Sequence, residues 1–494
     1  MQLSLLKSLS LSDLKKSDEK LVYFMAYLYS ISTGELEQAS DLVKTASNSD
    51  YGNYSSAFRD AYRLGVGWTF GMAKSLEMVA MKVSSELGNP LKQFLVKFAQ
   101  VVRLGDKLST FFRAELTSSL VTYAIEYERK LEMQKLFLEM FYTLMSTAAF
   151  MIAANSIMTM LTGANSSELI LVYSLIGVAV SMSMFVFIMY MLFPRDKLAF
   201  SREDVDLKFR IKVYVSIGAG TGIGIVLLIS QALPLSLVVG ISLAPLFYPG
   251  LLARKMEQRI KKINQWYPEF IRHFGEILAT VGSMGQTLDA VLRSDFGPIQ
   301  KFVISLKNRI KNKVDQQHGF ELFSRDCGSE LVANGNQVIS TSLDKGGDMN
   351  ETGNRVADIT VKINELRAKR EQTSKTFESI IIVLHVLTLG VFGLMNKLTS
   401  IFFELISTVD ISNNAFPLSP IDPAFMDMIL PIMILMTSVI SSIALKVAQG
   451  GLYKTVFYHI ALLGVLGSIT TFAMNVLMSD YLESSILDFG DVGV

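Results

Sequence analysis

The sequence has little cysteine, histidine and charge, and these shortages exclude several kinds of site. Its 494 residues include one cysteine, Cys327, so no intrachain disulfide can form. The four histidines are not at metal-ligand spacings, and one cysteine cannot support a zinc site. We therefore expect Cys327 to be a small buried apolar side chain. The sequence predicts no metal and no cofactor.

Motifs for phosphate binding and nucleophilic catalysis are also missing. The chain contains no G-x-x-x-x-G-K-[ST] loop and no nucleophile-elbow sequence. The alternating glycines of 218–224 superficially suggest a nucleotide loop, but they follow no strand and lie within an apolar run. Small residues at four-residue spacing allow close helix packing in membranes, which is the favoured interpretation here. We expect the protein not to be an enzyme.

Charged residues are few in this chain, and apolar residues are abundant. Half of the chain is apolar, 18% is charged, and mean hydropathy is +0.37. Residues 21–136 show no alternation of apolar and polar side chains of the kind that indicates a strand. Seven apolar runs have about the twenty residues that a helix needs to cross a membrane. They are 137–161, 169–193, 211–230, 233–252, 378–406, 427–445 and 455–478.

The lysines and arginines alternate between successive connecting segments. Of the 46, 17 lie in residues 1–136, 6 in 195–212 and 20 in 253–376. The intervening segments 162–168, 231–232, 406–426 and 479–494 have none. Positive loops stay inside, so we expect the N-terminus to be cytoplasmic and the C-terminus extracytoplasmic, in a multi-pass protein of the cell membrane.

The predicted fold class is all-α: a polytopic membrane protein with about seven transmembrane helices and two homologous cytoplasmic helical-bundle domains. The expected order is an amphipathic segment, a first helical domain, four transmembrane helices, a second helical domain, three transmembrane helices and an acidic tail. These cover 1–20, 21–136, 137–252, 253–377, 378–478 and 479–494.

Glycine turns suggest that the two helical domains are repeats. The stretch 342–359 is a glycine-broken polar turn about thirty residues before an apolar run, and 101–113 is a fainter copy of it. Gly34 and Gly285 each end an earlier apolar helix and precede a similar short sequence. Chance similarity between generic helical segments is the alternative. The candidate landmarks are Gly34, Gly105, Asp106, Gly285, Gly346, Gly347 and Asp348.

These glycine–acid turns have two interpretations. They are hinges or contact tips, because glycine adopts backbone geometries closed to other residues. Alternatively they are ordinary helix caps, with Asp106 and Asp348 capping the helices that follow. The ionisable residues within the spans also have two interpretations: they form a proton path, or they lie near the ends of long helices. These residues are His385, Lys397, Glu404 and Asp427.

Basic clusters are the remaining signal for partners. The cluster 254–262 directly follows the fourth span, and its position favours topology and anionic-lipid contact. A second cluster is expected on one helix and favours an acidic protein partner; a third lies just before the fifth span. Without interleaved aromatic residues, we expect no nucleic acid. The members of the second and third clusters are Lys307, Arg309, Lys311, Lys313, Arg367, Lys369 and Arg370.

The paired turns, each followed by apolar spans, resemble the F-family membrane platform proteins of type II secretion and type IV pilus systems. The larger number of spans resembles the archaeal branch, which serves archaella and adhesive pili. The resemblance implies a non-enzymatic platform that docks a hexameric secretion ATPase, holds pilin- or archaellin-like filament subunits and forms a homo-oligomer, expected to be a dimer. The competing hypotheses are a transporter or channel through the four central spans and a membrane signalling scaffold.

Overall fold

The computed structural model describes residues 18–34, 38–83, 89–162, 167–200, 203–408 and 423–490, which are helical almost throughout. Within these ranges no strand is formed, and one isolated bridge joins Ala199 to Ser329. Seven helices there are long and apolar enough to cross a membrane. The predicted all-α polytopic fold is therefore confirmed. Residues 1–17 of the amphipathic segment expected over 1–20 lie outside the described residues. Residues 409–422 and 491–494 also lie outside them.

The described chain divides into two units. Unit 1 comprises residues 1–131, 196–202 and 257–369, and unit 2 comprises 132–195, 203–256 and 370–494. Unit 1 therefore combines most of both predicted cytoplasmic domains. Three helices contain residues of both units: α7 (Leu108–Thr162), α11 (Phe247–Val281) and α16 (Met349–Thr408).

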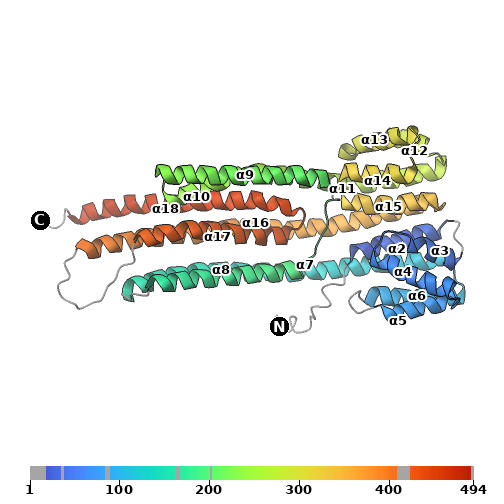
Figure 1. Cartoon of the computed structure of the whole chain (residues 1–494), viewed down its shortest axis with the longest axis horizontal. Helices are drawn as coiled ribbons and strands as arrows, with labels where there is room; N and C mark the ends of the chain where they lie inside the picture. The colour runs from blue at the N-terminus through green and yellow to red at the C-terminus, as the bar shows by residue number, and fades with distance from the viewer. Residues whose placement is uncertain are drawn as a thin grey trace. The chain divides into compact units, whose positions relative to one another are not determined.

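The remaining helices of unit 1 come from two blocks of sequence. The first block supplies α2 to α6, with a short π-helix (η2) after α4, and the second supplies α12 to α15 with the 3₁₀ turn η5 (Figure 1). Their bounds are α2 Glu19–Ser32, α3 Ala39–Ser47, α4 Asn53–Tyr62, η2 Arg63–Gly67, α5 Met72–Lys82, α6 Asn89–Leu104, α12 Met284–Val291, η5 Gly297–Ile299, α13 Gln300–Lys311, α14 Gln316–Cys327 and α15 Glu330–Asp344.

Helix α2 lies in the core of unit 1. Asp18 caps its start by accepting a hydrogen bond from the Lys20 N–H (2.9 Å). Every residue from Val22 to Ile31 is buried, so the helix has no solvent face. A helix that is apolar all round is expected to be enclosed on all sides. One continuous apolar core includes residues of α2, α4, α6, α11, α15 and α16, and Cys327 is buried in it as expected.

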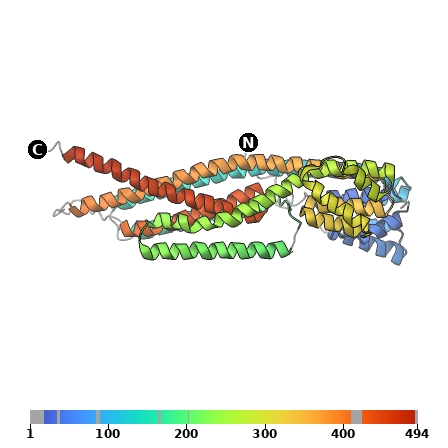
Figure 2. The same ribbon diagram turned by 90° about the horizontal axis from the view of Figure 1, so that it is seen from above.

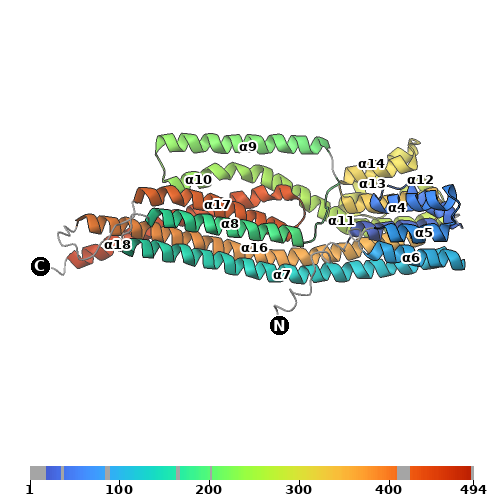
Figure 3. The ribbon, with the colours of Figure 1, turned by 60° about the horizontal axis from the view of Figure 1, so that its bottom comes forward.

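Unit 2 holds the apolar helices. These are α8 Ser167–Leu192, α9 Glu203–Ser230, α10 Leu235–Leu243, α17 Pro423–Gln449 and α18 Val456–Gly490, with the short turns η4 Ala244–Leu246 and η6 Tyr453–Thr455. Helix α8 packs on α17, and α10 packs on α9, α17 and α18 (Figures 2 and 3). The second and fourth spans thus pack against the last two spans.

Two details of unit 2 bear on the sequence predictions. The fourth span, expected over 233–252, lies within the candidate span Leu235–Val281, which passes through the 3₁₀ turn η4, where Pro245 has no N–H to donate. In α9 the alternating glycines pack as predicted, at two positions. A Cβ on Gly220 would lie 2.3 Å from the Ser242 carbonyl oxygen, and one on Gly224 would lie 2.6 Å from the Ser242 hydroxyl. Only glycine permits this approach of α9 to α10.

Candidate functional site: the glycine turns and basic clusters

The turn between α15 and α16 contains the clearest sequence landmark. Gly346 has φ +65°, a left-handed conformation that favours glycine. The Gly347 N–H donates to the Ser342 carbonyl (2.7 Å), which closes the end of α15. The Asp348 carboxylate then accepts from the Glu351 N–H (3.1 Å). Asp348 therefore caps the start of α16, which is the second of the two interpretations drawn from the sequence.

The end of α2 packs directly against this turn. A Cβ on Gly34 would lie 2.3 Å from the Lys345 carbonyl oxygen. A Cβ on Gly347 would lie 2.7 Å from the Ser30 carbonyl oxygen. The Asp348 N–H donates to the Thr33 hydroxyl (3.1 Å), so the two turns are also joined by a hydrogen bond. We call Thr33, Gly34, Gly346, Gly347 and Asp348 the glycine joint.

The sequence comparison within the chain had matched Gly34 with Gly285. The structure brings Gly34 into backbone contact with the turn at Gly346 and Gly347, about 310 residues later in the chain. Gly285 lies in the first turn of α12, where a Cβ would meet nothing within 4 Å. The left-handed glycine before α12 is Gly282, with φ +69°.

The other early landmark is an open turn. Gly105 has φ +74°, and its N–H and that of Asp106 both point to the Val101 carbonyl, at 3.0 and 3.3 Å. A Cβ on Gly105 would meet nothing within 4 Å. Glycine is therefore required here for its backbone conformation, whereas at Gly34 and Gly347 it is required for space.

A charged group lies beside the glycine joint. Glu351, in the first turn of α16, accepts a hydrogen bond from the Tyr29 hydroxyl (3.1 Å). Its carboxylate also faces Arg113 of α7 at 3.7 Å and Arg355 at 3.5 Å. Helices α2, α7 and α16 therefore meet at one carboxylate next to the joint.

The predicted basic helix is α13, and most of its cations are paired inside unit 1. Lys307 and Lys311 both contact the Asp289 carboxylate, at 2.7 and 3.1 Å. Hydrogen bonds from these two lysines lower the pKa of Asp289. Arg309 pairs with Asp326 at 2.6 Å. All three side chains have an internal role that the sequence did not indicate.

Lys313 differs from the other three. The sequence placed it on the same helix, but α13 ends at Lys311, and Lys313 follows in a left-handed turn with φ +59°. The Asn312 N–H makes a last helical hydrogen bond to the Asn308 carbonyl (3.0 Å), and the Lys313 N–H then donates to the Ile310 carbonyl, three residues back (3.0 Å). Lys313 is exposed and has no ion-pair partner among the described residues. It is the member of this cluster whose charge is not paired with a carboxylate of the described residues.

The third basic cluster is divided between the two units. In unit 1, Arg367 pairs with Glu19 at 2.8 Å, and Lys369 pairs with Glu128 at 2.5 Å. Arg367 also donates to the Lys197 carbonyl (3.2 Å). These contacts connect α16 to the start of α2 and to α7 within unit 1.

Arg370 belongs to unit 2 and is only 2% exposed. Its guanidinium donates to three backbone carbonyls: Pro194 at 2.7 Å, Val447 at 2.9 Å and Ala448 at 3.0 Å. The last two are terminal carbonyls of α17, which have no partner within their own helix. Arg370 therefore caps α17, and its buried position leaves no surface to offer a partner.

One exposed feature was missed at the sequence level. After η2, Trp68 is 62% exposed and Phe70 is 42% exposed, with their rings stacked at 6.5 Å. Thr69 between them has φ +58°, and Gly71 has φ +80°. The signal was available in the sequence VGWTFG, where two aromatic residues lie between glycines.

Comparisons with known proteins identify relatives of the whole chain. No family model matches it, and no solved structure matches it. Flagella accessory protein J of Methanocaldococcus jannaschii is 24% identical to it over 503 aligned residues, covering 96% of this chain and 87% of the relative. The protein of the same name from Methanococcus voltae is 22% identical over 494 residues, covering 96% and 88%. The chain is thus similar along nearly all its length to archaeal flagella accessory protein J, and its resemblance to the archaellum type of membrane platform protein is confirmed.

Proposed function

We propose that the chain is the membrane platform on which an archaellum-type filament is assembled, with unit 1 in the cytoplasm contacting a hexameric secretion ATPase. The observation that supports this most is the combination of seven apolar helices with similarity to flagella accessory protein J over 96% of the chain. Helices α7, α11 and α16 contain residues of both units. These continuous helices are the proposed route by which movement of unit 1 reaches the membrane helices. Filament subunits are the proposed partners of the apolar helices.

The proposed orientation follows from the distribution of positive charge. The N-terminus and unit 1 lie in the cytoplasm, and the end of α18 lies outside. Cys327 is buried, which makes single-cysteine labelling practicable after Cys327→Ser. In intact cells, an impermeant maleimide should label Asp480→Cys and should not label Asp106→Cys or Lys313→Cys. All three positions are exposed. Labelling of either cytoplasmic position before lysis would refute the orientation.

The ATPase contact is proposed to include Lys313. Lys313→Glu reverses an exposed charge without breaking an ion pair of the described structure. We expect it to reduce co-purification of the ATPase several-fold and to make the remaining association less sensitive to salt. Lys92→Glu on α6, also exposed, is the matched control. Equal ATPase recovery with both variants and the unmodified chain would remove Lys313 from the contact.

A further inference from the structure

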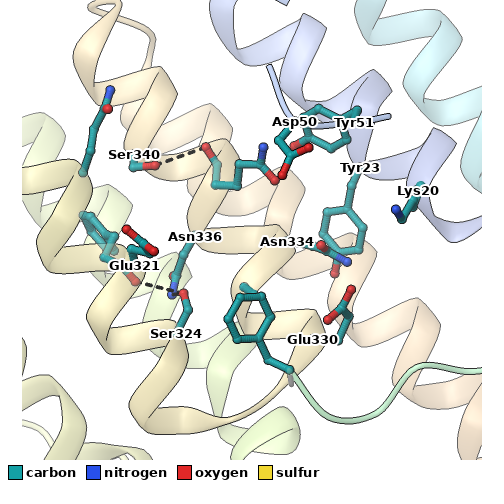
Figure 4. A pocket seen from close by; sticks show the side chains of 15 residues that line it. Lys20, Tyr23, Asp50, Tyr51, Glu321, Ser324, Glu330, Asn334, Asn336 and Ser340 are labelled. Carbon is teal, nitrogen blue, oxygen red and sulfur yellow. Dashed lines mark hydrogen bonds between the residues drawn. The ribbon is translucent and has the colours of Figure 1, made fainter. Parts of the chain in front are cut away.

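A cleft of about 380 Å³ opens in unit 1 where the two blocks of sequence meet. Its walls come from α2, the segment before α4, α14, α15 and the segment at Phe200 (Figure 4). The volume lies within the range of small-molecule sites, about 300–1,000 Å³. We call it the α2–α15 cleft. Neither the glycine joint nor the basic clusters contribute to it.

Two carboxylates on these walls form no ion pair among the described residues, although Lys20 lines the same cleft. Asp50 and Glu330 line the cleft, and neither has an ion pair or side-chain hydrogen bond among the described residues. The Glu330 N–H donates to the Leu198 carbonyl (3.2 Å), which fixes the start of α15. Burial raises the pKa of Glu330, although Lys197 and Lys20 act in the opposite direction. The charged form of Glu330 is thus incompletely compensated in this structure.

A third wall group is a buried tyrosine hydroxyl. Tyr51 is 4% exposed, and its hydroxyl has no hydrogen-bond partner among the described residues. Its ring is held by Phe24 and Tyr27, with centroids 5.3 and 5.2 Å away. A buried polar group without a hydrogen-bond partner destabilises the folded state. This unpaired hydroxyl is a feature of the cleft wall independent of the two carboxylates.

Two polar side chains on the wall, Asn336 and Ser324, already have hydrogen-bond partners. The Asn336 amide donates to the Ser324 hydroxyl (2.8 Å) and accepts from Tyr267 (2.9 Å). The aromatic ring of Phe320, 1% exposed, closes the cleft beside them. The cleft thus combines two carboxylates without an ion pair, the exposed Asp50 and the half-buried Glu330, with Lys20 and aromatic residues on the same walls.

We propose that the α2–α15 cleft binds an organic cation, a primary ammonium or guanidinium group, with Asp50 and Glu330 as its carboxylate acceptors. The Tyr51 hydroxyl and the aromatic wall complete the site. The cation is carried either by a free amine or by a lysine or arginine side chain of a partner protein. Because the walls come from both sequence blocks, an occupant stabilises unit 1 by connecting α2 to α15.

The test uses the full chain purified in detergent, titrated with agmatine while the apparent melting temperature and the heat of binding are measured. We expect a saturable rise in melting temperature. Glu330→Gln and Asp50→Asn should each weaken the affinity for agmatine at least tenfold. Without agmatine, Glu330→Gln should melt no lower than the unmodified chain, because it removes a poorly compensated charge. Glu269→Gln, an exposed carboxylate on α11 outside the cleft, should leave binding unchanged.

A short peptide with one arginine between uncharged residues distinguishes the two sources. Tighter binding of the peptide than of agmatine supports a partner side chain, and the reverse supports a free amine. Three results would overturn the proposal. They are no saturable binding of either probe, an equal rise in melting temperature with potassium chloride at the same ionic strength, and agmatine affinity that Glu330→Gln and Asp50→Asn leave intact.

Discussion

Substituting Gly34 with alanine tests the glycine joint directly. The new Cβ would lie 2.3 Å from the Lys345 carbonyl oxygen and 3.2 Å from the Gly346 carbonyl carbon. Both are backbone atoms, so no side chain can rotate away, and the end of α2 must separate from the α15–α16 turn. Overpacking of this kind costs about 1–3 kcal/mol. Separation would also weaken the hydrogen bond from Asp348 to Thr33, a further loss of about 1 kcal/mol.

The expected total is therefore about 2–4 kcal/mol, from these two contributions. For a unit of this size, each kcal/mol lowers the melting temperature by about 2–4 °C. We expect Gly34→Ala to melt several degrees below the unmodified chain in detergent, measured by intrinsic fluorescence. Gly347→Ala should behave similarly, since its Cβ would lie 2.7 Å from the Ser30 carbonyl oxygen. The double variant should cost less than the sum, because separating α2 from the turn relieves the clash at Gly34 and the approach of a Gly347 Cβ to Ser30, while its approach to the Ser342 hydroxyl remains.

Gly285→Ala is the matched control for this prediction. It places a Cβ at a helical glycine where nothing lies within 4 Å. Alanine in a helix is favoured over glycine by about 0.5–1 kcal/mol, so the melting temperature should stay constant or rise. If Gly34→Ala and Gly285→Ala melted alike, or if the effects of Gly34→Ala and Gly347→Ala were simply additive, the close contact of the two turns would be refuted.

Three further predictions concern buried charge. Arg370→Ala should lower the free energy of unfolding by about 3 kcal/mol or more, because several charge-assisted hydrogen bonds to carbonyls are lost. Arg370→Lys should restore only part of the melting temperature lost in Arg370→Ala, and full restoration would contradict the capping role. Arg367→Met should cost about 3 kcal/mol by leaving Glu19 buried without its partner, and Glu19→Leu in the same chain should restore much of it; equal melting of single and double variants would contradict the pairing. Burial raises the pKa of Glu330 above 4.5, so protonation of Glu330 favours the folded state; this stabilisation is present at low pH and is lost as the pH rises through the raised pKa. The difference in melting temperature between Glu330→Gln and the unmodified chain should therefore grow from pH 4 upward. A difference that stays constant with pH would contradict this prediction.

The sequence predicted what depends on local pattern and composition. The apolar run 137–161 correctly indicated a helix long enough to cross a membrane, which the structure has as the second half of α7. Glycine packing in α9 followed from four-residue spacing, and the buried state of Cys327 followed from residue type. Each of these is determined by residues that lie close together along the chain.

The sequence could not predict contacts between distant segments. The pairing of Gly34 with Gly347 depends on α2 meeting α15, and nothing near either glycine encodes that meeting. Likewise, four lysines and arginines close in sequence suggested a basic surface, but Asp289 and Asp326 neutralise three of them from other helices. The two carboxylates of the α2–α15 cleft come from different blocks, so no motif could have marked them.

The enclosure of α2 has a consequence for synthesis of the chain. Tyr23 of α2 contacts Thr360 of α16, 337 residues later, through their hydroxyls. At about 5–20 residues per second, translation reaches Thr360 roughly 20–70 seconds after Tyr23 is made. During that interval the four central spans must enter the bilayer while α2 remains without the helices that finally cover it. An apolar helix that stays uncovered for this long is prone to aggregation. A chaperone or the translocation machinery would have to bind α2 until the second half of unit 1 has been synthesised.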